Sequence, residues 1–228
     1  MRQTALALIC LAAPAAAGDF RPPQGCTATL TVQSRGCSVE HIWTCEGEEQ
    51  GLQWRGELDD QGLTYVGQID AETQWLQSYF PLSGARELLV LPAADPASFS
   101  TLMETGEDTY DFTLDTLEGP QRVVGFDRLD ERGVVIDGET LDRTAYAVRK
   151  TDAAGGLIYA AEGFEYVSKE FGRFFSGAGT ISGPTGPDYD YDSRPVKFIR
   201  PGEPGFLSDR PLYGCAAQEA RFEPEQKD

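Results

Sequence analysis

The residues best suited to chemistry form a short run of alternating acidic and aromatic side chains. Residues 188–193 read Asp-Tyr-Asp-Tyr-Asp-Ser. Carboxylates at alternate positions resemble the opening of a calcium loop, where such ligands converge on one ion. Ser193 stands where that loop needs glycine, and its bidentate glutamate is missing, so this is not an EF-hand. Asp188, Asp190 and Asp192 are therefore candidates for a weak Ca²⁺ site, and no other cofactor is expected.

Aromatic side chains supply a second set of candidates. Tyr189 and Tyr191 alternate with those aspartates, and either contact a ligand or partner or fold onto the protein as part of a solvated loop. Phe174 and Phe175 lie in a segment rich in rings. If that segment lines a barrel, its rings either hold a small apolar ligand or fill the core.

No catalytic residue is assigned from the sequence. The chain has one histidine, His41, and a Ser-His or Cys-His site would have to use it. The predicted hairpin around it places His41 on the inward strand face, which favours a structural role. No nucleophile elbow, Ser-x-x-Lys motif or Walker loop occurs. The chain's 37 acidic residues leave a two-carboxylate hydrolase, acting on polysaccharide or peptidoglycan, as the alternative function.

The cysteines predict both a hairpin and two disulfides. A two-residue turn at Arg35-Gly36 places Cys26 opposite Cys45 and pairs Leu30 with His41. We therefore predict a Cys26–Cys45 bridge, which leaves Cys37 to pair with Cys215. The spacing of these cysteines does not match a zinc site.

The rest of the chain also reads as hairpins. A turn at 59–62 predicts the pairs Leu58–Leu63, Gly56–Tyr65, Trp54–Gly67 and Leu52–Ile69. A turn at 130–133 and a hairpin of 140–151 with 157–168 are expected later, and residues 183–211 as loop. Short helices are expected over 75–80 and after an N-cap at Asp95.

Together these patterns predict one mainly β domain over residues 18–228. The steady spacing of turns, near ten residues, is typical of an all-β fold. Because successive strands pair in order, we expect a single antiparallel meander that forms a barrel or a strongly curved sheet, with one or two short helices.

Residues 1–17 have the features of a secretory signal peptide. Arg2 precedes an apolar stretch from Thr4 to Ala13, and small residues follow at 15–17. Paired cysteines fit an oxidising compartment. A composition rich in Ala, Gly, Pro and Arg and without Asn favours a GC-rich bacterium. We therefore expect a periplasmic or secreted location.

The net charge of the chain limits the classes of partner that it can bind. The formal net charge is −18, which disfavours nucleic acid because the phosphate backbone would repel it. No apolar run is long enough for a membrane-spanning helix. We expect an exported, non-catalytic binding or envelope-associated protein, whose partner is a small apolar or aromatic molecule or an envelope protein. A purely structural envelope factor is a further alternative.

Overall fold

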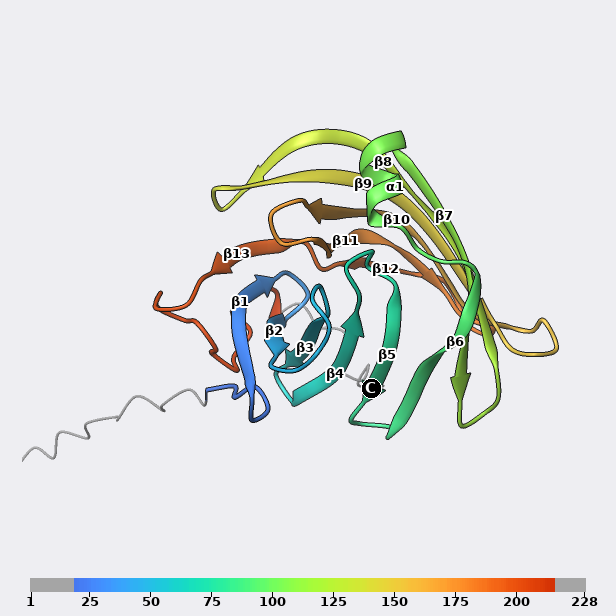
Figure 1. Ribbon diagram of the computed structural model, residues 1–228, viewed down its shortest axis with the longest axis horizontal. Coiled ribbons are helices and arrows are strands. Elements are labelled where there is room, and N and C mark those ends of the chain that lie inside the picture. Colours follow the sequence, from blue (N-terminus) through green and yellow to red (C-terminus); the bar gives the residue numbers. More distant parts are fainter. Residues whose placement is uncertain (1–18, 216–228) are drawn as a thin grey trace, which may run out of the picture.

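The computed structural model describes residues 19–215 as one antiparallel sheet of 13 strands with one short helix. The strand order is β12-β11-β10-β9-β8-β7-β6-β5-β4-β3-β2-β1-β13, so all strands but the last pair with their neighbours in sequence. The sheet curves strongly without closing into a hydrogen-bonded barrel (Figure 1). The predicted meander and strongly curved sheet are confirmed, and the predicted signal peptide, residues 1–17, lies outside the described residues.

The strands vary from short edge segments to long curved ones. They are β1 (Cys26–Ser34), β2 (Ser38–Cys45), β3 (Gln53–Asp59), β4 (Gly62–Ile69), β5 (Trp75–Phe80), β6 (Ala85–Asp95), β7 (Glu107–Thr116), β8 (Gln121–Ile136), β9 (Glu139–Thr151), β10 (Leu157–Ser168), β11 (Arg173–Ser182), β12 (Tyr189–Asp192) and β13 (Pro195–Ile199), with the helix α1 (Phe99–Thr105) between β6 and β7. Among the described residues, no helix has the length and apolar character of a membrane span.

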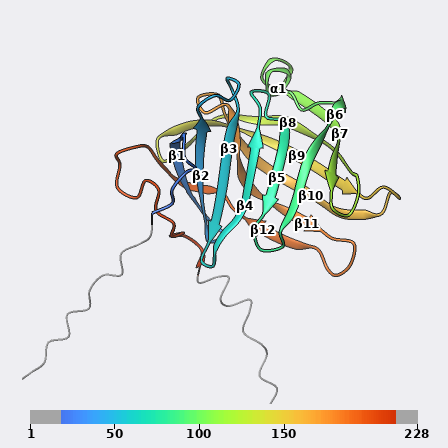
Figure 2. The same ribbon diagram turned by 60° about the horizontal axis from the view of Figure 1, so that its bottom comes forward.

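Curvature brings two parts of the sheet face to face. Figure 2 shows β1–β6 in front of β8–β11. At one end Leu30, Val32 and Ile42 form a core cluster with Phe175 and Phe198. A second cluster, built on Tyr110, Phe112, Leu114, Val123 and Val148, packs against Trp75, Leu89 and Tyr159 from both parts. The surface inside the curve is therefore lined by packed side chains, and we call it the inner face.

The two edges of the sheet are joined through the chain. β12 pairs with β11 and β13 pairs with β1, and only Ser193 and Arg194 separate β12 from β13. The Arg35 N–H donates to the Arg194 carbonyl (2.9 Å), and the Ser193 N–H donates to the Gly177 carbonyl (2.8 Å). The connection between the two edge strands is thus fixed from both sides.

The first hairpin contains a bulge that the sequence did not indicate. Cys26 lies opposite Cys45 as predicted, but the register shifts between Ala28 and Leu30. Leu30 therefore pairs with Ile42 rather than with His41, and Thr31 lies opposite His41. The bulge inserts one residue into β1. Because side chains alternate between the two faces of a strand, each β1 side chain after the bulge lies on the face opposite to the one that simple alternation predicts. His41 lies on the outer face as a result.

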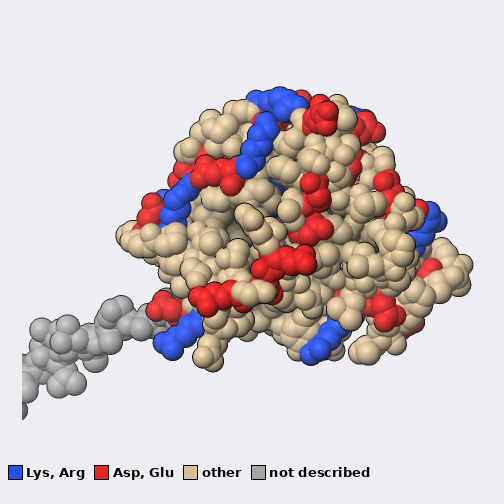
Figure 3. Space-filling model, in the orientation of Figure 1, with Lys and Arg blue, Asp and Glu red and all other residues tan. Residues whose placement is uncertain are grey.

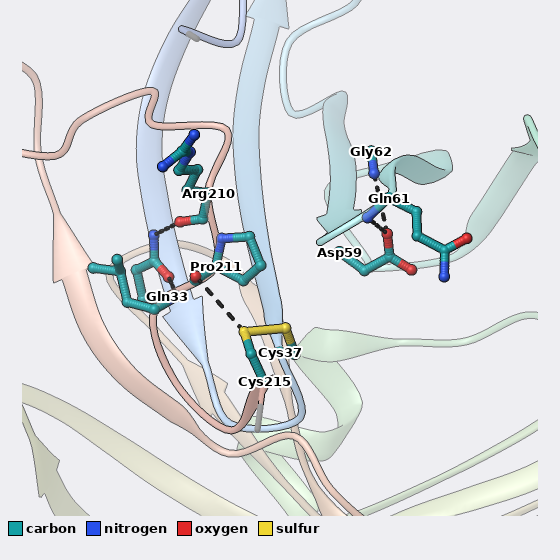
Figure 4. Close-up of a disulfide and its surroundings, with 9 residues drawn as sticks. Gln33, Cys37, Asp59, Gln61, Gly62, Arg210, Pro211 and Cys215 are labelled. Carbon is teal, nitrogen blue, oxygen red and sulfur yellow. Dashed lines mark hydrogen bonds between the residues drawn. A yellow bond between two sulfur atoms is a disulfide. The ribbon is translucent and has the colours of Figure 1, made fainter. Parts of the chain in front are cut away.

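The C-terminal segment covers this outer face. Gln33 Nε2 donates to the Arg210 carbonyl (2.9 Å), and the Leu212 N–H donates to Gln33 Oε1 (2.9 Å). Beside these bonds, the Cys37–Cys215 disulfide ties the segment to the β1–β2 turn (Figure 4). A second disulfide joins Cys26 to Cys45. The first pairing leaves the second, and both are the pairs predicted from the sequence.

The β3–β4 hairpin also contains a bulge, and this one changes the chemistry of the inner face. Leu58 pairs with Leu63 as predicted, but beyond that pair Glu57 lies opposite Tyr65 and Arg55 opposite Gly67. The predicted pairs Gly56–Tyr65, Trp54–Gly67 and Leu52–Ile69 are therefore wrong. Arg55 and Glu57 share the face of Tyr65, whereas Trp54 stacks on Trp43 on the opposite face.

Several local predictions need correction. Trp75–Phe80 is a strand, not a helix, and its backbone pairs with β4 and β6. The predicted second helix forms as α1, but its N-cap is Ser98, whose hydroxyl accepts from the Thr101 N–H. No turn interrupts β8 at 130–133, where irregular pairing with β9 replaces it. The expected loop 183–211 contains β12 and β13. The hairpin of 140–151 with 157–168 is confirmed.

Candidate functional site

The tyrosine–aspartate run forms the edge strand β12 and the residue before it. Asp190 accepts from Thr180 Oγ1 (2.8 Å). Asp192 is held by Arg194, which donates through Nε (2.8 Å) and Nη2 (2.7 Å). Among residues 19–215 there is no cluster of three His, Cys, Asp or Glu side chains that could hold a metal ion. The structure therefore gives no support to a Ca²⁺ site at Asp188, Asp190 and Asp192.

The four aromatic candidates have different environments. Tyr189 is 54% exposed. The Tyr191 hydroxyl lies 2.5 Å from the Tyr146 hydroxyl. Tyr191 lies opposite Gly179 on β11, which lies opposite Gly163 on β10, and Gly163 in turn lies opposite Tyr146 on β9. Phe175 is buried in the core cluster, 5.0 Å from the Phe198 ring, and Phe174 is half-buried. Of the two phenylalanines proposed as ligand contacts, Phe175 instead fills the core.

His41 has the environment of a structural histidine. Its ring stacks on Phe20 at 4.5 Å, and its Nδ1 lies 3.0 Å from Thr31 Oγ1. Burial lowers the pKa of His41 to about 4, and the backbone of Ser208 has a smaller, opposite effect. The histidine is therefore neutral at pH 7 and packed beneath the terminal segments.

The inner face carries a charged layer that sequence reasoning missed. Arg55 Nη1 lies 3.7 Å from Glu40 Oε2 and Nη2 lies 4.0 Å from Glu57, while its guanidinium covers the Tyr65 ring at 4.8 Å. Burial disfavours the charge on Arg55, but its acidic neighbours outweigh burial and raise its pKa. Arg173, 4% exposed, contacts Gln53, and burial followed by the charge of Arg55 lowers its pKa to about 10. Arg55 thus faces two acids on β2 and β3, whereas Arg173 on β11 contacts the neutral Gln53 of β3 and so joins the two parts of the sheet. Glu40 Oε2 and Arg173 Nε have no hydrogen-bond partner among the described residues.

Two carboxyl groups in this layer share a proton. Asp127 on β8 and Glu165 on β10 are hydrogen-bonded to each other. Burial raises the pKa of Asp127 to about 7, and burial together with Asp127 raises that of Glu165 well above its usual value. Such a pair can act as a general acid or base only if a substrate reaches it. Asp127 is 7% exposed and Glu165 is half-buried, and neither lines the groove described next, which favours a structural role for the pair.

The accessible concavity lies on the other side of the same strands. It is a groove of about 550 Å³ across β7–β11, and we call it the outer groove. Tyr146 and Val148 belong to the inner side of β9, so the alternating residues Ala147 and Arg149 face outward. Its volume falls within the range of small-molecule sites.

The outer groove is hollow because its floor is built from small side chains. In one cross-strand row Phe126 is followed by Ala147, Glu162 and Thr180 on the next three strands. In the neighbouring row Val124 is followed by Arg149, Ala160 and Ser182. The apolar floor thus consists mainly of Val124, Phe126, Ala147 and Ala160.

A shallower hollow of about 630 Å³ adjoins the outer groove. The two share Glu162 and Thr180, and the second reaches Asp190 and Tyr191 on β12. The outer groove itself also reaches Asp188. Asp188, predicted as a metal ligand, therefore lies at the outer groove. Tyr191, predicted as a ligand or partner contact, lines the adjoining hollow, and its hydroxyl contacts Tyr146 of the inner side.

The floor had no recognisable sequence pattern. Alanine, threonine and valine on outward strand positions are ordinary surface residues when only one strand is considered. The sequence contains one indication of the floor, because small residues recur on the outward side of three successive strands. Using it requires the register of β9, β10 and β11, which the sequence left open.

Comparisons with protein-family models, with curated proteins and with solved structures found no match for this chain. The function proposed below therefore rests on the geometry of the inner charged layer and of the outer groove.

Proposed function

We propose that this protein is an exported, non-catalytic binding protein of the bacterial periplasm that holds a small ligand with an apolar body in the outer groove. The observation that carries the proposal is the groove itself, about 550 Å³ with an apolar floor and a few polar groups around it. Most small-molecule sites combine these features. The two disulfides support a location in an oxidising compartment.

Binding is preferred to hydrolysis because of the arrangement of the carboxylates. Two-carboxylate glycosidases separate their acids by about 5 to 9.5 Å to admit the sugar or a water. Asp127 and Glu165 are instead hydrogen-bonded to each other and lie on the inner face. A ligand in the outer groove would be separated from them by the sheet.

A site in the groove is also preferred to a protein-binding surface. Of the four rings that the sequence offered as contacts for a ligand or partner, only Tyr189, on a four-residue edge strand, is exposed. One ring is a small anchor for a protein interface, which usually buries a cluster of such residues. A purely structural role does not account for the concave, apolar floor of the outer groove.

The test is to fill the groove. Ala160→Trp places an indole on the floor, and Leu88→Trp places the same ring on the exposed outer side of β6, away from the groove. The neutral dye Nile red should show a blue-shifted emission with the wild type and with Leu88→Trp. With Ala160→Trp the shift should disappear, at an unchanged melting temperature. Equal dye binding by all three proteins would contradict the proposal.

A further inference from the structure

Three acidic residues around the outer groove have no charged partner. Glu107, Glu162 and Asp188 line the groove and are exposed. Within residues 19–215, none of these three carboxylates makes an ion pair or a side-chain hydrogen bond. By contrast, Asp111 on the neighbouring part of β7 is bound by Arg122 through Nε at 2.8 Å. The carboxylates of the groove are thus free to meet an external charge.

The balance of charge in the groove is negative. Arg149 is the one base among the residues that line it, against three acids. A second base, Arg128, lies over the Phe126 ring at 5.7 Å, so the acids still outnumber the bases. On the face shown in Figure 3, acidic side chains gather over the middle and basic ones lie mainly toward the margins, in keeping with the net charge of −18. A negative, concave surface raises the local concentration of cations.

We propose that the ligand of the outer groove is a small amphipathic cation. Its apolar body lies on Val124, Phe126 and Ala160, and its cationic group lies toward Glu162 and Asp188. The inference rests on the proposed function, because it assigns a ligand class to the same groove. An anionic amphiphile would meet three unpaired carboxylates and is excluded by repulsion. A neutral one would bind through the floor alone.

The probes are three molecules with the same chain length: octyltrimethylammonium, octyl glucoside and octanesulfonate, each titrated calorimetrically below its micelle concentration. Because an exposed ion pair changes an affinity only a few fold, two carboxylates predict about a tenfold preference for the ammonium over the glucoside. Octanesulfonate should bind more weakly than the glucoside. The preference should fall as salt is added, whereas binding of the glucoside should not.

The variant that decides the point is Glu162→Gln with Asp188→Asn. It should bind the ammonium and the glucoside equally while keeping the wild-type affinity for the glucoside. The matched control is Asp60→Asn with Glu118→Gln, which changes the net charge by the same amount at exposed positions outside the groove. The control should keep the tenfold preference.

The outcomes separate this inference from the proposed function. Equal affinities of the wild type for ammonium and glucoside would overturn the cation and leave an apolar groove ligand. Loss of the preference in the control pair would mean that general charge attraction, not the groove, selects cations. Failure of all three probes to bind, or binding that persists in Ala160→Trp, would overturn the proposed function as well.

Discussion

The inner and outer faces of the sheet both carry charged residues, but those residues have different surroundings. On the inner face Arg55, Glu40 and Glu57 face one another, and Asp127 shares a proton with Glu165. On the outer face Glu162 and Asp188 have no such partners among the described residues. Buried charges that satisfy each other are structural elements, whereas exposed charges beside an apolar hollow are available to a ligand. The difference indicates that availability, rather than the presence of charge, marks the candidate site.

The largest predicted effect comes from the same substitution made on each face. Arg55→Met leaves Glu40, which is 2% exposed, without its cation, and an uncompensated buried charge typically costs about 3–5 kcal/mol. Because Arg55 itself is 25% exposed, we expect a loss of about 3 kcal/mol. Arg149→Met removes an exposed cation without an ion-pair partner in residues 19–215 and should change stability by less than about 0.5 kcal/mol. Urea unfolding of both variants measures the difference. Equal losses would remove the distinction between the faces.

The second prediction concerns the shared proton. Burial raises the pKa of Asp127 to about 7, against about 3.9 in an unfolded chain, so the folded protein holds a proton that the unfolded chain releases. The stabilisation of the folded protein by this bound proton is complete below pH 4 and is lost as the pH rises through 7. Between pH 5 and pH 8 the loss amounts to about 3 kcal/mol.

Asp127→Asn combined with Glu165→Gln should remove that pH dependence, because burial raises the pKa of both carboxyl groups. Asp115→Asn, at an exposed position on the neighbouring strand, should keep it. The free energy of unfolding, measured by urea titration at several pH values, distinguishes the two. A slope that survives in the double variant would show that the carboxyl pair does not hold the proton.

The smallest predicted loss follows from His41. His41→Ala deletes a ring stacked on Phe20 and should lower stability by about 2 kcal/mol at pH 7 without changing binding in the groove. Because burial lowers the pKa of His41 to about 4, the wild type also loses stability as the pH falls from 6.5 to 4, and the variant should not. Thermal unfolding and Nile red titration check both points. Loss of dye binding at an unchanged melting temperature would contradict the structural role.

Much of the fold could be predicted from the sequence because its turns are marked by local residues. The Gly36 and Gly62 turns and the four cysteines indicate the first two hairpins and the disulfide pairing. The faces of these strands were less predictable. Each hairpin contains one bulge, near Thr29 and near Leu58, and an inserted residue leaves no mark on composition.

The charged layer was missed because the inward face of β3 was assigned from its own apolar residues. Alternation on β3 assigns Trp54, Gly56 and Leu58 to the core and Arg55 to solvent. In the structure Arg55 lies inside, because Glu40, Glu57 and Glu165 come from three different strands to neutralise it. Such pairing depends on tertiary contacts, so it could not be derived from one strand. The outer groove was missed for a related reason, since its floor requires the register of three strands.

Site-resolved photolabelling tests the central claim, that ligands bind the outer groove and not the inner face. A neutral alkyl diazirine probe of eight carbons is irradiated with the folded protein, and the modified residues are located by peptide mass spectrometry. We expect adducts on Val124, Phe126 and Glu162, and we expect these adducts to be lost in Ala160→Trp. Adducts concentrated on Arg55, Tyr65 or Glu165, on the inner face, would contradict it.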